Sequence, residues 1–196
     1  MVDRRDFIKT GVAASAGIML TEGLRLHRTT PAPCSIGIAL YDPRFPESVA
    51  FASALMAAGA EVISNDTDIG HLWHGALGTA FATSGGALAG MTPHSDLFVS
   101  QVIARERHRS RLAYEGLHDN RGNSGVTHSL SLPPPGRGLA ATVAAAGDSW
   151  PTLLATRLSQ LAFGPGRLER ETARNGTAAN GLPGTIFSWV IVKSAS

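Results

Sequence analysis

The stretch that decides the fold runs from residue 34 to residue 65 and reads CSIGIALYDPRFPESVAFASALMAAGAEVISN. It opens with a short apolar run that ends in polar residues, the pattern of a buried strand. Pro46 and Glu47 suit the first turn of a helix, whose apolar residues recur at helical spacing until Gly59. A second apolar run follows over residues 61–65. A strand, a helix and a strand within about thirty residues predict a right-handed, parallel βαβ unit.

The same alternation continues to the end of the chain and predicts the fold class. Strands alternating with helices indicate an α/β three-layer sandwich with a mostly parallel sheet of the Rossmann or flavodoxin type. The last strand is almost continuously apolar, which predicts burial on both faces. Residues 34–196 are expected to form a single domain. Further helices are predicted over 68–82, 94–108 and 138–163 (broken near 147–151), further strands over 86–92, 110–117, 126–132 and 185–194, and a long polar loop over 164–184.

Charge is concentrated at the N-terminus. The 196-residue chain has a formal net charge of +2, and residues 1–30 hold five basic and three acidic residues, so the remainder is neutral. A neutral body gives no electrostatic reason to expect nucleic acid as a partner. Cys34 is the one cysteine, which excludes an intramolecular disulfide and a cysteine-based zinc site.

The first residues are predicted to be a targeting signal rather than part of the domain. Residues 3–9 read DRRDFIK, and an apolar stretch follows over 10–20. That stretch is shorter than the roughly 20 apolar residues that span a bilayer, so it fits the core of a signal peptide. The segment resembles the twin-arginine (Tat) signal, with matches at Arg4, Arg5, Phe7, Ile8 and Lys9 and with Asp3 in place of the usual Ser or Thr.

The resemblance implies export of the folded protein by the Tat translocase into the periplasm. No clean A-x-A cleavage site follows the apolar stretch before Cys34. Two fates of residues 1–33 therefore stay open. The segment is either a removed signal peptide or a retained anchor that tethers the periplasmic domain to the membrane.

Polar residues gather where the predicted strands end. In open parallel sheets, ligands bind beyond the carboxyl ends of the strands, so these residues are candidates for a ligand site. Polar loops at such places are also common without any function. The predicted ligand-binding residues are Asp42, Arg44, Asp66, Asp68, Thr92, His94, Ser95 and Asp96.

Histidines in the same loops raise the hypothesis of a metal or acid–base site. Imidazole and carboxylate are the usual ligands of zinc and iron, and histidine transfers protons near neutral pH. The alternative is that these histidines are ordinary polar residues near helix starts, since none stands in an H-E-x-x-H arrangement. The predicted metal ligands are His71, His94, His118 and Asp119.

Other catalytic signatures are absent from the sequence. It contains no G-x-G-x-x-G, no Walker A motif and no G-x-S-x-G, so the cofactor is left open. Residues 104–111 read ARERHRSR and place four arginines at the end of a predicted helix. There they either complement the helix dipole or dock an acidic partner.

The body resembles small Tat-signal proteins of proteobacteria. The likeness rests on residues 39–55, on DIGHLWH at 68–74 and on GMTPHSDLF at 90–98. It brings no activity and no catalytic residue with it. The first hypothesis is a periplasmic, non-catalytic accessory protein that accompanies an exported redox enzyme or a membrane complex. The alternative is a small periplasmic enzyme or ligand-binding protein that uses the His/Asp cluster at the strand ends.

Overall fold

The computed structural model describes residues 35–176 and 184–194. The predicted signal segment, including Arg4, Arg5, Phe7 and Lys9, lies outside the described residues. The strands are β1 (Ile36–Tyr41), β2 (Glu61–Ser64), β3 (Ala87–Thr92), β4 (Ser110–Asn120), β5 (Val126–Leu132), β6 (Glu169–Arg174) and β7 (Gly184–Lys193). The helices are α1 (Pro46–Ala57), α2 (Ile69–His74), α3 (Ala76–Thr83), α4 (His94–His108), α5 (Leu139–Ala145) and α6 (Trp150–Gln160), with 3-10 turns η1 (Gly122–Ser124), η2 (Pro134–Gly136) and η3 (Gly147–Ser149).

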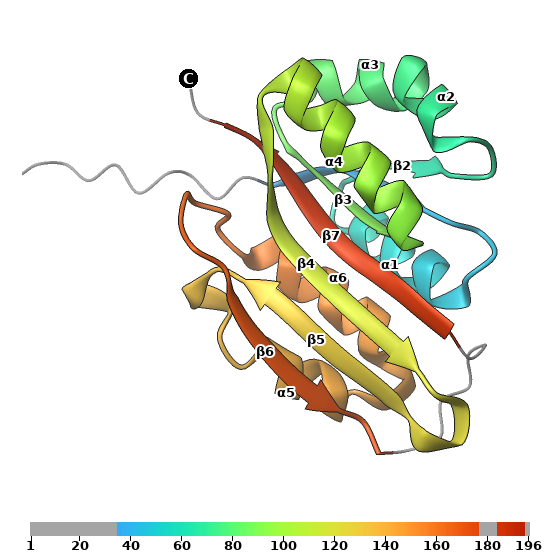
Figure 1. The fold of residues 1–196 in the computed structure, drawn as a ribbon, viewed down its shortest axis with the longest axis vertical. Coiled ribbons are helices and arrows are strands. Elements are labelled where there is room, and N and C mark those ends of the chain that lie inside the picture. The colour runs from blue at the N-terminus through green and yellow to red at the C-terminus, as the bar shows by residue number, and fades with distance from the viewer. Residues whose placement is uncertain (1–34, 177–183, 195–196) are drawn as a thin grey trace, which may run out of the picture. The chain divides into compact units, whose positions relative to one another are not determined.

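The strands form one seven-stranded sheet in the order β2-β1-β3-β7-β4-β5-β6 (Figure 1). Only the pairs β1–β2 and β1–β3 are parallel, and the other four pairs are antiparallel. The α/β class is confirmed, but the expectation of a mostly parallel, Rossmann-like sheet is wrong. The predicted βαβ unit over 34–65 is present as β1, α1 and β2.

The cause of the difference is the position of β7. This strand enters between β3 and β4 and pairs antiparallel with both. Its apolar side chains point alternately to the two faces, and Trp189 and Val190 are both fully buried. A central place in the sheet is the one that buries both faces of such a strand.

Two successive antiparallel pairings leave β4 running in the same direction as β3. The strands β1, β2, β3 and β4 therefore all end at one edge of the sheet, as the βα alternation predicted. We call this the carboxyl edge, and we call the opposite edge, where these four strands begin, the amino edge.

A second difference concerns residues 164–184, which were expected to be a polar loop. Part of this segment forms β6, with the sequence ERETAR. It pairs only with β5 and lies at the border of the sheet. Charged side chains are typical of edge strands because they discourage pairing with another chain. Because such a strand lacks alternating apolar residues, its sequence does not indicate a strand.

The predicted helix over 68–82 is also divided in two. It breaks at Gly75, which separates α2 from α3. A Cβ atom at Gly78 would overlap with the backbone carbonyl of Trp73, so glycine at this position lets α3 begin close against the end of α2.

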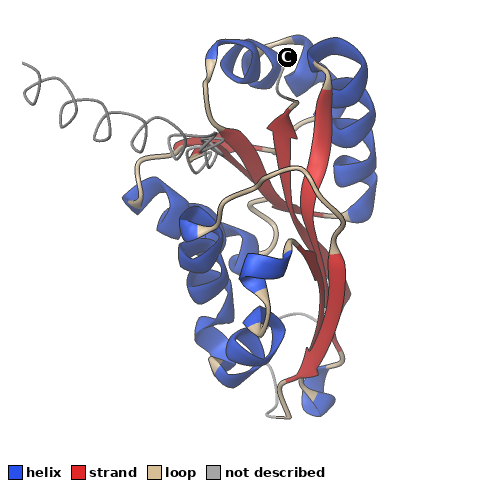
Figure 2. Ribbon diagram, turned by 90° about the vertical axis from the view of Figure 1, so that its left-hand side faces the viewer, coloured by secondary structure: helices blue, strands red, loops and turns tan. Residues whose placement is uncertain are grey.

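Helices cover both faces of the sheet (Figure 2). On one face, α1, α5 and α6 pack through residues such as Phe51, Leu55 and Leu154. On the other face, α2, α3 and α4 pack through Trp73 and Phe81 among others. In Figure 1 no helix lies in front of β5 and β6, so that part of the sheet presents a polar outer face.

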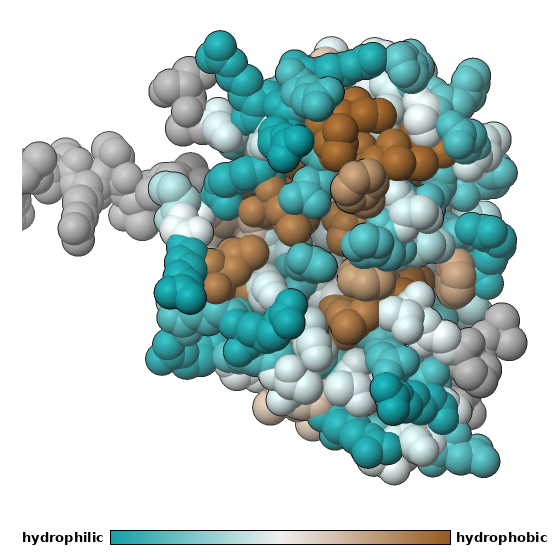
Figure 3. Space-filling model, in the orientation of Figure 1, coloured by the Kyte–Doolittle hydropathy of each residue, from teal (hydrophilic) through white to brown (hydrophobic). Residues whose placement is uncertain are grey.

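No helix in the described ranges combines the length and the hydrophobicity needed to cross a bilayer. Hydrophobic side chains do reach the surface among polar ones near α4 (Figure 3). The large apolar side chains that are exposed in the described part of the chain are Val49, Met56 and Phe98.

Candidate functional site

Two predicted ligand residues meet at the end of β1. The carboxylate of Asp42 is fully buried and accepts hydrogen bonds from Nε and Nη2 of Arg44, at 2.9 and 2.5 Å. Burial alone raises the pKa of Asp42, but the hydrogen bonds and the positive charge of Arg44 outweigh burial and hold the pKa below its ordinary value. Asp42 is therefore a charged group at neutral pH.

A second carboxylate, Asp96, stands at the start of α4. It accepts hydrogen bonds from Nδ2 of Asn65 at 2.6 Å and from the hydroxyl of Ser95 at 3.2 Å. Burial raises the pKa of Asp96, and the charge of Asp42 raises it further. The pKa of Asp42 is thus lowered and that of Asp96 is raised, and the two carboxylates repel each other across the ends of β1 and β3.

Asn65 belongs to this group, although sequence reasoning did not select it. It directly follows β2 and is almost completely buried. Its Oδ1 atom has no hydrogen-bond partner among the residues that the structure describes. The available signal was its position at a strand end, next to Asp66, which was selected instead.

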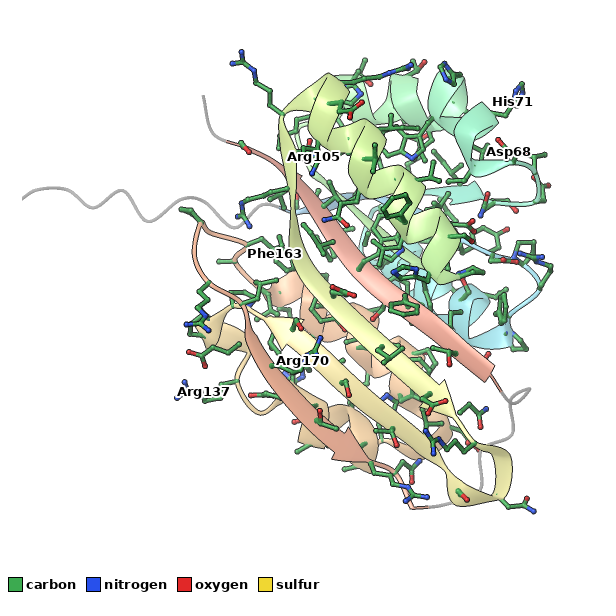
Figure 4. The ribbon with its side chains drawn as sticks, in the orientation of Figure 1. Asp68, His71, Arg105, Arg137, Phe163 and Arg170 are labelled. Atoms are coloured by element: carbon green, nitrogen blue, oxygen red, sulfur yellow. The ribbon has the colours of Figure 1, made fainter. Side chains whose placement is uncertain are left out.

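The remaining predicted ligand residues play structural roles or lie on the surface. The buried hydroxyl of Thr92 donates to the carbonyl of Pro93 and accepts from Nε1 of Trp189. Asp68 caps α2 by accepting from the backbone N–H of His71. Asp66 and Asp68 are exposed, and Figure 4 shows Asp68 and His71 together at the outer end of α2.

The structure does not bring the four predicted metal ligands together. His71 is exposed on α2, and His94 is exposed with its ring 4.9 Å from that of Phe187. His118 and Asp119 are consecutive in β4, so their side chains point to opposite faces of the sheet. Asp119 pairs with Arg121 on the outer face. Within residues 35–176 and 184–194, no three His, Cys, Asp or Glu side chains are placed to hold a metal ion.

His118 instead belongs to a buried chain of hydrogen bonds that sequence reasoning missed. Its Nδ1 atom lies 2.8 Å from Nδ1 of His128, and its Nε2 atom lies 2.7 Å from the hydroxyl of Ser188. The Ser188 hydroxyl lies 2.8 Å from that of Tyr114. All four side chains are at most 1% exposed. We call this set, Tyr114, Ser188, His118 and His128, the polar chain.

Three neighbouring strands build the polar chain. His118 in β4 stands directly opposite His128 in β5, and Gly116 stands opposite Ser188 in β7. A Cβ atom at Gly116 would overlap with the hydroxyls of Tyr114 and Ser188. Glycine at position 116 therefore leaves the space in which the two hydroxyls meet.

Both imidazoles in the polar chain are neutral. Burial lowers the pKa of His118 well below its ordinary value, and the charge that His128 would carry lowers it further. Burial lowers the pKa of His128 to about 4. When two neutral rings meet through their Nδ1 atoms, one Nδ1 carries a proton and donates it, and the other Nδ1 accepts.

The direction of donation follows from the hydroxyls. When Tyr114 donates to Ser188, Ser188 donates to His118 and His118 donates to His128, every proton has an acceptor except the one on Nε2 of His128. The reverse direction leaves the proton of the buried Tyr114 hydroxyl without an acceptor. Among the described residues Nε2 of His128 has no partner in either direction, so the first direction leaves one group unsatisfied and the reverse leaves two, which favours the first.

A small pocket adjoins the polar chain at the carboxyl edge. The indole of Trp150, at the start of α6, lies over the ring of His118 with the ring centres 4.3 Å apart. The free volume of the pocket is about 20 Å³, which is room for about one water molecule. We call it the Trp150 pocket, and it is lined by Phe45, Glu47, His118, Asn120, Val126, Trp150, Gly184, Thr185 and Ile186.

Charges are segregated between the two edges of the sheet. The turns and element ends at the carboxyl edge hold seven acidic and three basic residues, a net charge of −4. The acidic residues are Asp42, Glu47, Asp66, Asp68, Asp96, Asp119 and Asp148, and the basic ones are Arg44, Arg121 and Arg174. Since the described part of the chain is neutral, the positive charge lies elsewhere, and the carboxyl edge has a negative potential that attracts cations.

Comparison with known proteins adds no relative. The chain matches no protein-family model, and no curated protein or solved structure is similar enough to count as a match.

Proposed function

We propose that this chain is an exported periplasmic binding protein that takes the cationic head of a small ligand, a primary ammonium group of about the size of a water molecule, in the Trp150 pocket. The observation that carries the proposal is the carboxylate of Glu47, which lines this pocket and takes part in none of the described ion pairs. Glu47 stands in the first turn of α1, where the helix dipole favours a carboxylate, and this partly buried charge is available to pair with a cation.

The aromatic walls of the pocket support the same ligand chemistry. Phe45 and Trp150 line it together with Glu47. The face of an aromatic ring attracts a cation within about 6 Å of its centre, and tryptophan does so best. One face of the Phe45 ring already carries the guanidinium of Arg44, 5.9 Å from the ring centre, and the Trp150 indole lies against His118. An ammonium group would therefore contact the remaining surface of these rings and the carboxylate of Glu47.

The floor of the pocket does not oppose a cation. His118 lines it, and a protonated imidazole there would repel a positive ligand. Because burial keeps the pKa of His118 well below its ordinary value, the ring stays neutral at neutral pH. The polar chain thus supplies a polar but uncharged floor.

The position of Glu47 is fixed by its neighbour. The buried hydroxyl of Ser48 donates to the carbonyl of Met91 at the end of β3 and accepts from the backbone N–H of Asp42. These bonds tie the first turn of α1 to the ends of two strands. With the backbone anchored, only the side-chain rotamers of Glu47 are left to be ordered when the ligand binds.

The test is ligand-dependent stability. Methylammonium, ethylammonium and propylammonium chloride are added to the full chain at an ionic strength matched with sodium chloride, and the thermal unfolding midpoint is recorded. At least one of the organic cations should raise the midpoint, because a ligand that binds only the folded state stabilises it by mass action. Glu47→Gln should abolish the rise, while Glu61→Gln, which removes an exposed carboxylate at the amino edge, should retain it. Equal midpoints in sodium and in all three organic cations would refute the proposal.

The accessory role stays a prediction with one supporting observation. Phe98 on α4 is 59% exposed, and hydrophobic side chains surface around this helix (Figure 3). Such a surface suits contact with a partner. Purification of the tagged chain from its own membranes tests this role, and a monomer without a co-purifying protein would count against it.

A further inference from the structure

We infer that the amino edge of the sheet is a docking surface for the anionic headgroups of a phospholipid bilayer. This edge mirrors the carboxyl edge in charge. Its turns and element ends hold seven basic and three acidic residues, a net charge of +4. The basic residues are Arg105, Arg107, Arg109, Arg111, Arg137, Arg167 and Lys193, and the acidic ones are Glu61, Glu106 and Glu169.

Four segments that are distant in sequence are tied together at this edge. Arg111 at the start of β4 donates to the carbonyls of Phe163 and Gly164, which fixes the loop after α6 beside β4. Lys193 at the end of β7 donates to the carbonyls of Ala82 and Ser84, which fixes the turn before β3. The basic residues therefore belong to one continuous, braced surface.

Structural roles account for only some of these cations. Arg111 and Lys193 bind carbonyls, and Arg137 pairs with Glu169. Arg105, Arg109 and Arg167 are exposed and take part in none of the ion pairs in the described ranges. Figure 4 shows Arg105 near the end of α4 where β4 begins. The helix dipole explains one favourable cation at the end of α4, but it does not explain Arg167 in another loop.

Arg109 extends the basic surface beyond the helix. It is the one non-glycine residue with a positive φ, 49°, in the described part of the chain. This left-handed conformation ends α4 and turns the chain into β4. The turn itself is anchored, because the Arg109 carbonyl accepts a hydrogen bond from the N–H of Ser194.

The sequence that precedes the body identifies the bilayer as the anionic partner. The chain enters β1 at the amino edge, directly after Ser35. Residues 10–20 are apolar, and 14 residues, 21–34, separate them from Ser35. If the proposed signal segment engages a membrane, the amino edge is the edge closest along the chain to that membrane. Basic residues beside such a segment bind anionic lipids.

If the amino edge faces the membrane, lipid binding and ligand binding take place at opposite edges of the sheet. The acidic carboxyl edge and the Trp150 pocket lie at the other ends of the strands. They would stay open to a ligand while the amino edge contacts lipid. The inference about lipid does not depend on the identity of the ligand, and the two proposals can fail separately.

The experiment is sedimentation of the full chain with vesicles of phosphatidylcholine alone and with vesicles containing phosphatidylglycerol. The edge variant is Arg105→Gln with Arg109→Gln. The control variant, Arg121→Gln with Arg174→Gln, makes the same change in net charge at the carboxyl edge. Urea titrations establish that both variants remain folded.

We expect the full chain to bind phosphatidylglycerol vesicles more tightly than neutral ones. The edge variant should lose about fivefold in affinity for each arginine removed, since each basic residue near an anionic surface contributes roughly that factor. The control variant should bind as the parent does, and raised salt should weaken the parent most. Equal binding to both kinds of vesicle, or equal losses in the two variants, would overturn the inference and leave the surface for an acidic protein.

Discussion

The Nδ1 atoms of His118 and His128 lie 2.8 Å apart, between residues that stand directly opposite each other in β4 and β5. One of the two atoms must donate the proton and the other must accept it. The hydrogen bond therefore exists only while at least one of the two Nδ1 atoms is unprotonated. Protonation of both rings would replace this hydrogen bond with repulsion between two buried cations.

Acid should destabilise the protein through this pair. The pKa of His128 falls from 6.5 in the unfolded chain to about 4 in the folded protein. The unfolded chain therefore binds more protons between these values, and the free energy of unfolding should fall as the pH falls from about 6.5 to about 4. The loss from His128 is on the order of 3 kcal/mol, and His118 adds to it. Urea denaturation at pH 7.5, 6, 5 and 4 measures the slope.

His128→Phe should reduce the pH slope, because the phenyl ring does not titrate. Parallel pH slopes in the parent and in this variant would show that the His118–His128 pair is not the titrating group.

The hydroxyl of Ser188 should be the most sensitive link of the polar chain. Ser188→Ala removes the partner of both Tyr114 and His118, and leaves two buried polar groups unsatisfied. We expect a loss of about 1–3 kcal/mol in the free energy of unfolding. Tyr114→Phe removes one hydrogen bond and leaves Ser188 donating to His118, so it should cost about 1 kcal/mol. Chemical denaturation of both variants and of the double variant measures their coupling, and a larger loss for Tyr114→Phe than for Ser188→Ala would show that Ser188 is not the central link of the polar chain.

The sequence predicted correctly that β1 to β4 run in one direction, but it did not predict that β5 and β7 run against them. Each βα step is local, so the alternation of strands and helices over residues 34–117 was sufficient to predict that β1 to β4 end at one edge. The insertion of β7 was not predictable in this way. An apolar strand at the end of the chain needs two covered faces, but its own sequence does not say which pair of strands it separates. The polar edge strand β6 had no hydrophobic pattern to reveal it.

The same limit applies to the sites. Asp42, Arg44 and Asp96 were predicted to lie together because strand ends meet at the carboxyl edge. The polar chain depends instead on the register between β4 and β5. A hairpin alignment that places His118 opposite His128 would have found it, because both residues occupy the buried positions of alternating strands. Trp150 joins them only through tertiary packing of α6.

The arginine pair at the N-terminus should decide where the protein is found. Replacement of Arg4 and Arg5 by lysine keeps the charge but removes the feature that resembles the Tat signal, so we expect export to stop. Fractionation of cells that express the parent and the variant measures the periplasmic share. A matched change of Arg25 and Arg28 to lysine is the control. Equal periplasmic shares in parent and variant would exclude Tat export, and N-terminal sequencing of the exported parent distinguishes a removed signal from a retained anchor.

Neutralising the two carboxylates at the strand ends should have opposite effects on stability. The pKa of Asp96 is raised, so its charged form is disfavoured in the folded protein, and stability is lost as the pH rises through that pKa. Asp96→Asn should therefore raise the free energy of unfolding at pH 7 and leave it unchanged near pH 3. The pKa of Asp42 is lowered, so its stabilisation is present at neutral pH and is lost in acid.

Asp42→Asn should accordingly lower the stability at pH 7, because Arg44 loses its charged partner and one of the two oxygens that accept from it is replaced by an NH2 group. Denaturation of both variants at pH 7 and pH 3 measures the difference. Stabilisation by Asp96→Asn would also show that the parent tolerates repulsion between Asp42 and Asp96. Such repulsion is expected where a negative potential serves to attract a cation. A loss of stability at pH 7 in both variants would instead make the two carboxylates ordinary partners in the packing of the strand ends.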